Sequence, residues 1–177
     1  MKNWYAIYVR PRAEKKVSLT FVEKRLEHYL PLNKCLRQWS DRKKWVEIPV
    51  ISGYIFVKID KSERLDILKT DFVHGFVRYL GKEAVIPEIQ IKTMKYILGQ
   101  ADFDVEIDFS NYKKDQPVRV LAGPLAGVTG NLVSVRNRKK LIIRLEQINL
   151  NIILEIPVNQ VELIKPVNKP IAETYIS

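Results

Sequence analysis

The chain has 177 residues, of which 46% are apolar and 28% charged, and its formal net charge is +10. This length suffices for one full domain and a smaller one, and the composition is that of a folded protein. No run approaches the roughly 18 apolar residues of a membrane span, and Met1-Lys2-Asn3-Trp4 opens on a strand pattern, not a signal peptide. The single cysteine, Cys35, excludes an internal disulfide and a cysteine-rich zinc site. We therefore expect a cytoplasmic protein with no membrane partner.

The positive charge is distributed unevenly. Residues 1–99 hold 20 Lys and Arg against 11 Asp and Glu, residues 100–116 hold 2 against 5, and residues 117–177 hold 8 against 4. A basic surface attracts polyanions through a contribution that is salt-sensitive and largely blind to sequence. Two basic parts joined by an acidic segment favour a nucleic-acid partner, and solubility alone is the alternative explanation.

Strand and helix patterns alternate through the first 99 residues. Residues 4–9 are aromatic and β-branched without clean alternation, as in a central strand covered on both faces. Ala13, Val17 and Phe21 then recur every four residues, which indicates an amphipathic helix. Residues 29–39 and 45–50 are two extended runs on either side of the cationic segment S-D-R-K-K-W, so we expect a hairpin.

The second half of this region repeats the alternation. Residues 54–59 form its most hydrophobic strand, Ser62 is a candidate N-cap for a short helix carrying Leu65 and Leu68, and residues 72–80 are again strand-like. Pro87 suits the first turn of a helix with an apolar stripe that includes Ile91 and Met94. The order β-α-β-β-β-α-β-α predicts an α+β sandwich, with helices packed on a mostly antiparallel sheet.

Beyond residue 99 the periodicity stops and acidic residues accumulate. We expect a first domain over residues 1–99, an acidic linker over 100–115, a small β-domain over 116–165 and a loose tail over 166–177. In the β-domain, Gly123 and Pro124 predict a forced turn, since glycine accepts positive φ and proline fixes φ. Gly127 and Gly130 predict close packing of a strand on its neighbour. The short β-branched runs that follow are typical of a small closed barrel.

The stretch V-R-V-L-A-G-P-L-A-G-V-T-G resembles the KOW motif, which opens a five-stranded SH3-like barrel in transcription elongation factors and ribosomal proteins. The matching positions are Val118, Arg119, Val120, Gly123, Pro124, Gly127 and Gly130. The β-branched density of residues 118–164 favours a barrel over a helical hairpin in the resting state. The motif alone does not separate the two groups of proteins.

The first domain resembles the NusG N-terminal domain. The similar stretches are W-Y-A-I-Y-V-R-P-R-A-E-K-K-V, I-S-G-Y-I-F-V-K-I and F-V-R-Y-L-G-K-E-A-V-I-P, in that order. Residues 29–47 look most like the specialised paralogues of the UpxY and RfaH type. The resemblance implies a monomeric, non-catalytic elongation or antitermination factor without a cofactor. Such a factor binds the clamp helices of the largest RNA polymerase subunit and suppresses pausing or termination on selected operons, such as surface polysaccharide genes.

The resemblance also implies two sets of site residues. The polymerase-binding set is Trp4, Tyr8, Tyr54 and Phe56. Successive strand residues face opposite ways, so Tyr54 and Phe56 share one face while Ile55 and Val57 share the other. The alternative is that all four are ordinary core aromatics.

The second set is expected to contact non-template DNA or nascent RNA. It consists of Arg10, Arg12, Lys16, Trp39, Arg42, Lys43 and Lys44. Trp39 and Trp45 flank the hairpin tip and can stack on unpaired bases. The alternative is a solvated hairpin end whose tryptophans fold back on the sheet.

An enzyme is not indicated, because His28 and His74 lie far apart and nothing near them supplies a nucleophile, an orienting carboxylate or a metal-ligand spacing. Two other identities stay open. One is a housekeeping NusG-type factor, and the other is a KOW-containing RNA- or ribosome-associated protein. In relatives the barrel recruits a ribosomal protein or a termination factor, and no side chain in the sequence chooses between these partners.

Overall fold

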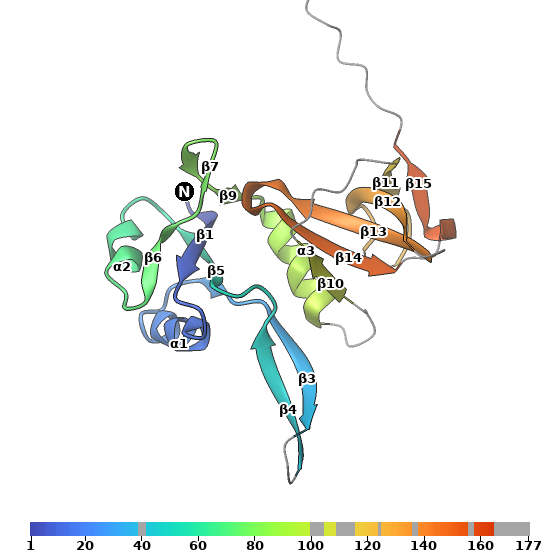
Figure 1. Cartoon of the computed structure of the whole chain (residues 1–177). Helices are drawn as coiled ribbons and strands as arrows, with labels where there is room; N and C mark the ends of the chain where they lie inside the picture. The colour runs from blue at the N-terminus through green and yellow to red at the C-terminus, as the bar shows by residue number, and fades with distance from the viewer. Residues whose placement is uncertain are drawn as a thin grey trace, which may run out of the picture.

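The computed structural model describes residues 1–38, 42–99, 105–108, 116–123, 125–135, 138–155 and 158–164. In the first 99 residues the helices are α1 (Glu14–Glu23), α2 (Arg64–Leu68) and α3 (Glu88–Gly99). The strands are β1 (Asn3–Val9), β2 (His28–Tyr29), β3 (Leu32–Gln38), β4 (Lys43–Pro49), β5 (Tyr54–Ile59), β6 (Val73–Phe76), β7 (Arg78–Tyr79), β8 (Lys82–Glu83) and β9 (Val85–Ile86). The arrangement is shown in Figure 1.

The main sheet of this half runs β2-β5-β1-β6, with β9 also paired to β1, and every pairing is antiparallel. On one face Ile7, Ile55 and Val57 pack with apolar residues of α1 and α2. On the other face Trp4, Ala6 and Phe56 belong to a cluster that contains Ile91, Met94 and Ile97 of α3. The predicted central strand, covered on both faces, and the predicted separation of Phe56 from Ile55 and Val57 are therefore confirmed.

The short helix expected to carry Leu65 and Leu68 is confirmed as α2, but its expected N-cap is wrong. Helix α2 buries Ile67, whereas Leu65 and Leu68 are exposed, because five residues give the helix one inward position. Ser62 is not the N-cap of that helix. Asp60 Oδ1 accepts hydrogen bonds from the backbone N–H of Ser62 at 2.9 Å and of Glu63 at 3.4 Å, and the bonds from Ser62 lower the pKa of Asp60.

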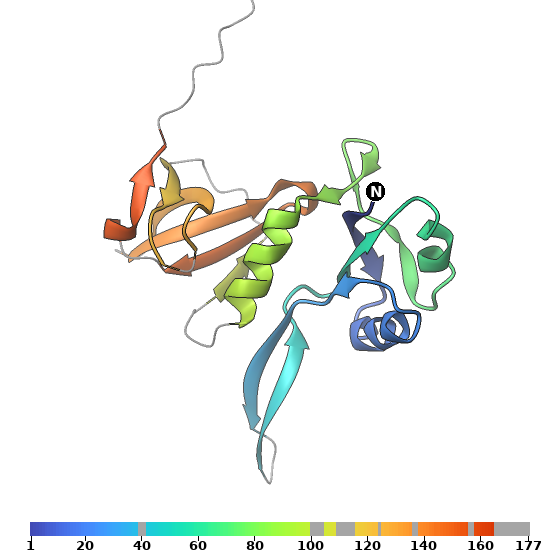
Figure 2. The same ribbon diagram turned by 180° about the vertical axis from the view of Figure 1, so that it is seen from behind.

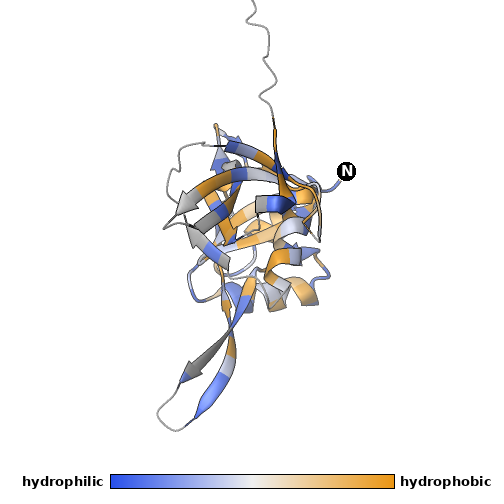
Figure 3. Cartoon of the chain, turned by 90° about the vertical axis from the view of Figure 1, so that its right-hand side faces the viewer, coloured by the Kyte–Doolittle hydropathy of each residue, from blue (hydrophilic) through white to orange (hydrophobic). Residues whose placement is uncertain are grey.

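Strands β3 and β4 form the predicted hairpin, and they make a separate two-stranded sheet. The hairpin projects from the body of the molecule, as Figure 1 and the side view of Figure 3 show. A two-stranded ribbon has no further strand beside it, and on β4 the side chains of Lys43, Lys44, Trp45 and Glu47 are exposed. Trp39 lies outside the described residues.

The C-terminal half forms a second antiparallel sheet in the order β10-β14-β13-β12-β11-β15. Its strands are β10 (Val105–Asp108), β11 (Gln116–Val120), β12 (Thr129–Val135), β13 (Arg138–Leu145), β14 (Leu150–Glu155) and β15 (Val161–Leu163). Two 3₁₀ turns, η1 (Glu146–Ile148) and η2 (Val158–Gln160), connect β13 to β14 and lead into β15. No pairing joins the edge strands β10 and β15 among the described residues, so a closed barrel is not seen in this part of the chain.

The linker prediction is corrected at residues 105–108. These residues pair with β14, where Val105 lies opposite Leu154 and Ile107 opposite Ile152. The alternation V-E-I-D is a strand pattern, and the acidic composition around it concealed that signal. The other residues of the expected linker, and the expected tail, lie outside the described part of the chain.

The glycines of the KOW-like stretch have two different tasks. Gly123 and Gly127 have φ of +75° and +85°, so both serve the turn between β11 and β12. Gly130 instead allows a close approach, because a Cβ there would lie 2.6 Å from the backbone oxygen of Ile142. The close-packing expectation is thus confirmed for Gly130 and wrong for Gly127, while Pro124 lies outside the described residues.

The two halves share one apolar core. The cluster around Trp4 and α3 also contains Val118, Leu141 and Ile152 of the C-terminal sheet. Helix α3 lies between the two sheets in both views of Figures 1 and 2. The 3₁₀ turn η1 of the C-terminal half also contacts β7 of the first half. In the described part of the chain no helix has the length and apolar character needed to cross a membrane.

Candidate functional site

Two tyrosines in contact with each other stand at the end of the β1–β5 pair. Tyr8 and Tyr54 are direct cross-strand partners, with ring centroids 4.8 Å apart and an interplanar angle of 58°. Their hydroxyl oxygens are 3.1 Å apart, and Tyr54 donates to Tyr8. Tyr8 is 42% exposed and Tyr54 is half-buried. Partial burial and the hydrogen bond to Tyr8 raise the pKa of Tyr54 above its ordinary value.

Strand β7 and the residue before it lie next to the two tyrosines. Val77 is buried beside Tyr8, and Tyr79 is exposed. We call Tyr8, Tyr54, Val77 and Tyr79 the tyrosine surface. It combines aromatic rings with hydroxyl groups, which is the character of protein-binding anchors.

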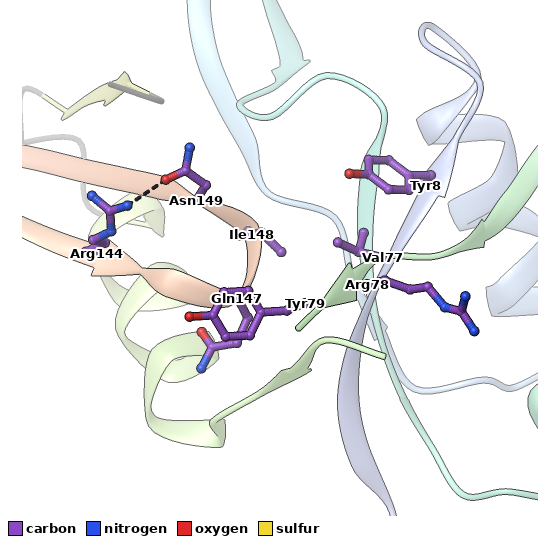
Figure 4. A pocket seen from close by; sticks show the side chains of 8 residues that line it. All are labelled: Tyr8, Val77, Arg78, Tyr79, Arg144, Gln147, Ile148 and Asn149. Atoms are coloured by element: carbon purple, nitrogen blue, oxygen red, sulfur yellow. Dashed lines mark hydrogen bonds between the residues drawn. The ribbon is translucent and has the colours of Figure 1, made fainter. Parts of the chain in front are cut away.

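A cavity of about 510 Å³ lies between the tyrosine surface and the C-terminal half (Figure 4). On one side it is lined by Tyr8, Val77, Arg78 and Tyr79. The other side comes from η1 and the ends of β13 and β14, where Arg144 Nη2 donates to Asn149 Oδ1 at 2.6 Å. The lining residues of that side are Arg144, Gln147, Ile148 and Asn149. The C-terminal half therefore stands next to the exposed rings and leaves a hollow between them.

Two of the four predicted polymerase-binding rings are not available on the surface. Trp4 is 3% exposed and Phe56 is 0% exposed, because α3 covers the sheet face on which they lie. Lys95 of α3 places its ammonium group 5.1 Å from the Trp4 ring centroid. Trp4 and Phe56 are core residues in this structure, which corrects their assignment as direct contacts and leaves Tyr8 and Tyr54.

Lys16, one of the three predicted cations near α1, lines a small cavity of about 240 Å³. Lys16 lies 4.7 Å from the Phe72 ring centroid, and Lys24 Nζ donates to Thr70 Oγ1 at 2.8 Å. The cavity is lined by Lys16, Thr20, Lys24, Lys69, Thr70, Asp71 and Phe72. Arg10 and Arg12 are exposed just before this helix, and Arg12 adopts a φ of +71°. Of this lining the sequence predicted Lys16 and missed two lysines, Lys24 at the end of the same helix and Lys69, which follows α2 and is distant in sequence.

The remaining predicted cations lie on the hairpin. Arg42, Lys43 and Lys44 are exposed at the beginning of β4. A second cavity, of about 620 Å³, lies between the hairpin and the start of α1. It is lined by Lys15, Lys34, Lys44, Trp45, Val46 and Glu47. Adjacent lysines of α1 thus serve two cavities, Lys15 on the hairpin side and Lys16 on the Phe72 side.

The histidines are part of the packing or of the surface. His28 Nε2 lies 2.8 Å from Ser18 Oγ, and its Nδ1 lies 2.9 Å from the backbone oxygen of Leu26. His74 is exposed on β6. Over the described ranges, no group of three His, Cys, Asp or Glu side chains is placed to hold a metal ion.

Comparison with protein families gives a match over residues 2–95 to the family described as transcription termination factor nusG. Among solved structures, the chain is similar to the one described as "Domain interaction in Thermotoga maritima NusG", at 18% identity and a TM-score of 0.55. That alignment covers 93% of this chain and 98% of the other, and at this identity it shows the fold alone. A second structure, the MjSpt4:Spt5 complex in conformation B, aligns over 92% of this chain and 97% of the other at 16% identity. Its TM-score of 0.31 is too low to indicate a shared overall fold.

Comparison with curated proteins found no match. The family match covers more than half of the 177 residues, and it includes β1, α1, the hairpin, β5 and most of α3. The solved structure of similar fold extends that agreement into the C-terminal sheet. On these grounds the chain belongs to the NusG family of non-catalytic transcription factors.

Proposed function

We propose that this chain is a transcription elongation factor that docks on RNA polymerase through the tyrosine surface. The expected partner is the clamp-helix coiled coil of the largest polymerase subunit. A helical hairpin of this kind presents an amphipathic face, and exposed aromatic anchors beside a hollow suit such a face. The observation that supports the proposal is the pair Tyr8 and Tyr54 at the end of the β1–β5 strand pair. Their rings are in tilted contact, their hydroxyls are hydrogen-bonded, and Tyr8 is exposed while Tyr54 is half-buried.

The effect of docking is proposed to be suppression of pausing or termination on selected operons, such as those for surface polysaccharides. The basis for this narrower role is the similarity of residues 29–47 to the specialised paralogues. A housekeeping elongation role is the alternative, and both roles use the same docking surface. Transcription assays on genes with and without a recruiting DNA element would distinguish the two roles.

The cations around α1 are proposed to contact nucleic acid in the transcribing complex. Lys16 lines a cavity with Lys24 and Lys69, and Arg10 and Arg12 are exposed just before the same helix, so positive charge at this end of the domain supports phosphate contacts. Arg42, Lys43 and Lys44 form a second group on the hairpin. Non-template DNA and nascent RNA are the two strands within reach of such a factor.

The C-terminal sheet is proposed to close into the SH3-like barrel of the KOW motif and to recruit a ribosomal protein or a termination factor. Support comes from the alternation on β11, where Val118 and Val120 are buried while Arg119 is exposed and pairs with Glu162 at 3.7 Å. A KOW-containing RNA- or ribosome-associated protein is the competing identity, and its signature is recovery of ribosomal subunits without polymerase.

The test is capture of purified RNA polymerase by the immobilised chain. Replacing Tyr8 and Tyr54 together by alanine removes both anchors, and we expect capture to fall at least tenfold. Alanine replacement of an interface anchor typically costs about 2 kcal/mol or more. Tyr54→Phe removes the hydroxyl that donates to Tyr8 and keeps the ring, so it separates the effect of the ring contact from that of the hydrogen bond.

Leu19→Ala is the matched control, because Leu19 is an exposed apolar residue of α1, which packs on the other face of the sheet. It should leave polymerase capture unchanged. Equal capture by the double-tyrosine variant and by the parent chain would reject the docking surface. Recovery of ribosomal subunits in place of polymerase would favour the competing identity.

A further inference from the structure

The cavity between the tyrosine surface and the C-terminal half has the size and the place of a small-molecule site. Its volume of about 510 Å³ falls within the range of about 300–1,000 Å³ that is usual for such sites. It lies where the two halves of the chain face each other, and junctions of this kind are preferred positions for ligands. The proposed docking on polymerase uses only one wall of the cavity. The other wall, from the end of β13 and from η1, has no role in that docking.

Gln147 of η1, in this second wall, has a buried polar atom without a partner. Its Oε1 is buried and accepts no hydrogen bond from any described residue. Such an acceptor is rare in a folded protein, and each case needs an explanation. The terminal amide can rotate to exchange the places of its oxygen and nitrogen, so either atom can be turned toward the cavity. A ligand that donates a hydrogen bond to this oxygen would explain it.

The rest of the lining is suited to a planar anion. Tyr79 of β7 and Gln147 come from elements in contact, and Figure 4 shows both at the same end of the cavity. Arg144 approaches from β13, and its Nη2 donates to Asn149 Oδ1 at 2.6 Å, which holds the guanidinium in position. Arg78 lines the opposite wall, and none of the described lining residues is acidic. A planar ring stacks on an exposed tyrosine, and a guanidinium binds phosphate or carboxylate through paired N–H donors.

The carboxamide selects among planar anions. A glutamine side chain recognises adenine through two hydrogen bonds, in which its oxygen accepts from the N6 amino group and its nitrogen donates to N7. We propose that the cavity binds a free adenine mononucleotide. The base stacks on Tyr79 and pairs with Gln147, and the phosphate binds Arg144. The nucleotide then contacts both halves of the chain and holds them together.

An aromatic carboxylate also combines a ring with an anion. It lacks the amino donor beside a ring acceptor that a carboxamide matches, so the adenine ring is favoured by Gln147. Binding of the nucleotide does not depend on the proposed function, but its consequence rests on that function. Tyr79 belongs to the tyrosine surface, so the nucleotide and polymerase should compete for it.

The test is isothermal titration calorimetry of the full chain with adenosine 5′-monophosphate, without polymerase. Two matched probes each lack one feature. Inosine 5′-monophosphate has an oxygen in place of the N6 amino group, and adenosine has no phosphate. We expect saturable binding of adenosine 5′-monophosphate and an affinity for inosine 5′-monophosphate that is about 5- to 150-fold lower, the discrimination of one bidentate pair. Adenosine should also bind more weakly, and its affinity should depend less on salt.

Gln147→Leu removes the carboxamide and keeps most of the side-chain volume. It should lower the affinity for adenosine 5′-monophosphate about 5- to 150-fold and remove the preference over inosine 5′-monophosphate. Its thermal unfolding midpoint should not fall, because the replaced oxygen has no partner among the described residues. A purely structural glutamine would instead give a lower midpoint.

Arg144→Gln removes the guanidinium that is proposed to bind the phosphate. It should lower the affinity for adenosine 5′-monophosphate to that for adenosine. Arg119→Gln is the control of equal charge, because Arg119 lies on β11 of the same sheet and outside the cavity lining. Circular dichroism checks that both variants are folded.

Three results would overturn the proposal. They are no saturable binding of adenosine 5′-monophosphate at millimolar concentration, equal affinity for the adenine and inosine nucleotides, or unchanged affinity in Gln147→Leu. Polymerase capture by Gln147→Leu should not fall, because Gln147 is outside the tyrosine surface. Added adenosine 5′-monophosphate should reduce capture by the parent chain only. Calorimetry without polymerase therefore tests the nucleotide site separately from polymerase docking.

Discussion

Glu14 buries a carboxylate at the start of α1, where it accepts a hydrogen bond from the backbone N–H of Gly53 at 2.7 Å. The side chain is 2% exposed, and Gly53 adopts a φ of +78° directly before β5. A Cβ at Gly53 would lie 3.3 Å from the backbone oxygen of Val9, so helix, turn and strand meet closely here. This bond positions the start of β5, whose first residue is Tyr54 of the tyrosine surface.

We expect Glu14→Ala to lower the free energy of unfolding by about 1–3 kcal/mol, because a buried backbone N–H loses its acceptor. Glu14→Gln retains an oxygen acceptor and should cost less. Urea unfolding followed by circular dichroism measures the change. Glu23→Ala, which truncates an exposed carboxylate at the end of the same helix, is the control. A loss no greater than that of the control would show that Gly53 finds another partner.

At the scale of single elements, glycines decide how closely strands approach. In β12, Gly130 lies opposite Val118 of β11, and a Cβ would meet the backbone of β13. The sequence predicted close packing at both Gly127 and Gly130, since a missing side chain looks the same at either position. The structure separates a turn residue from a contact residue, because that distinction depends on a neighbouring strand that is distant in sequence.

Gly130→Ala should destabilise the C-terminal sheet by about 1–3 kcal/mol, the usual cost of forcing an added carbon into a packed site. Gly127→Ala meets no neighbour but must hold a positive φ, which costs about 1–2 kcal/mol. Gly99→Ala, at the end of α3 with open space around it, should be neutral. Thermal unfolding ranks the three variants, and a Gly130→Ala midpoint equal to that of Gly99→Ala would contradict the packing argument.

At the scale of the whole molecule, the C-terminal half lies beside the surface that is proposed to bind polymerase. Ile148 of η1 lines the cavity opposite Tyr8 and Val77, and it belongs to the core cluster shared by both halves. A large partner that approaches Tyr8 and Tyr79 would meet η1 first. Docking is therefore expected to compete with the contact between the halves.

Ile148→Asp places a charge in that contact and should increase polymerase capture, since the C-terminal half then leaves the tyrosine surface more often. Hydrogen exchange should show faster exchange in β7 and at Tyr8. Leu163→Asp, at an exposed position of β15, is the control for an added charge in the same sheet. Faster exchange around Tyr8 without any gain in capture would show that η1 does not limit docking.

The sequence by itself determined the strand and helix order, the hairpin, the stripe of Val17 and Phe21, and the family, because periodicity, turn residues and local motifs are properties of neighbouring positions. Tertiary structure decided which rings are accessible. Trp4 and Tyr8 are both aromatic residues of the same strand, yet α3 covers Trp4 and leaves Tyr8 exposed. Tertiary structure also decided that residues 105–108 pair with β14 as a strand, and that Lys15 lines a cavity with residues of the hairpin. Exposure, strand pairing and shared cavities depend on segments far apart in the chain, and no local pattern encodes the distance between those segments.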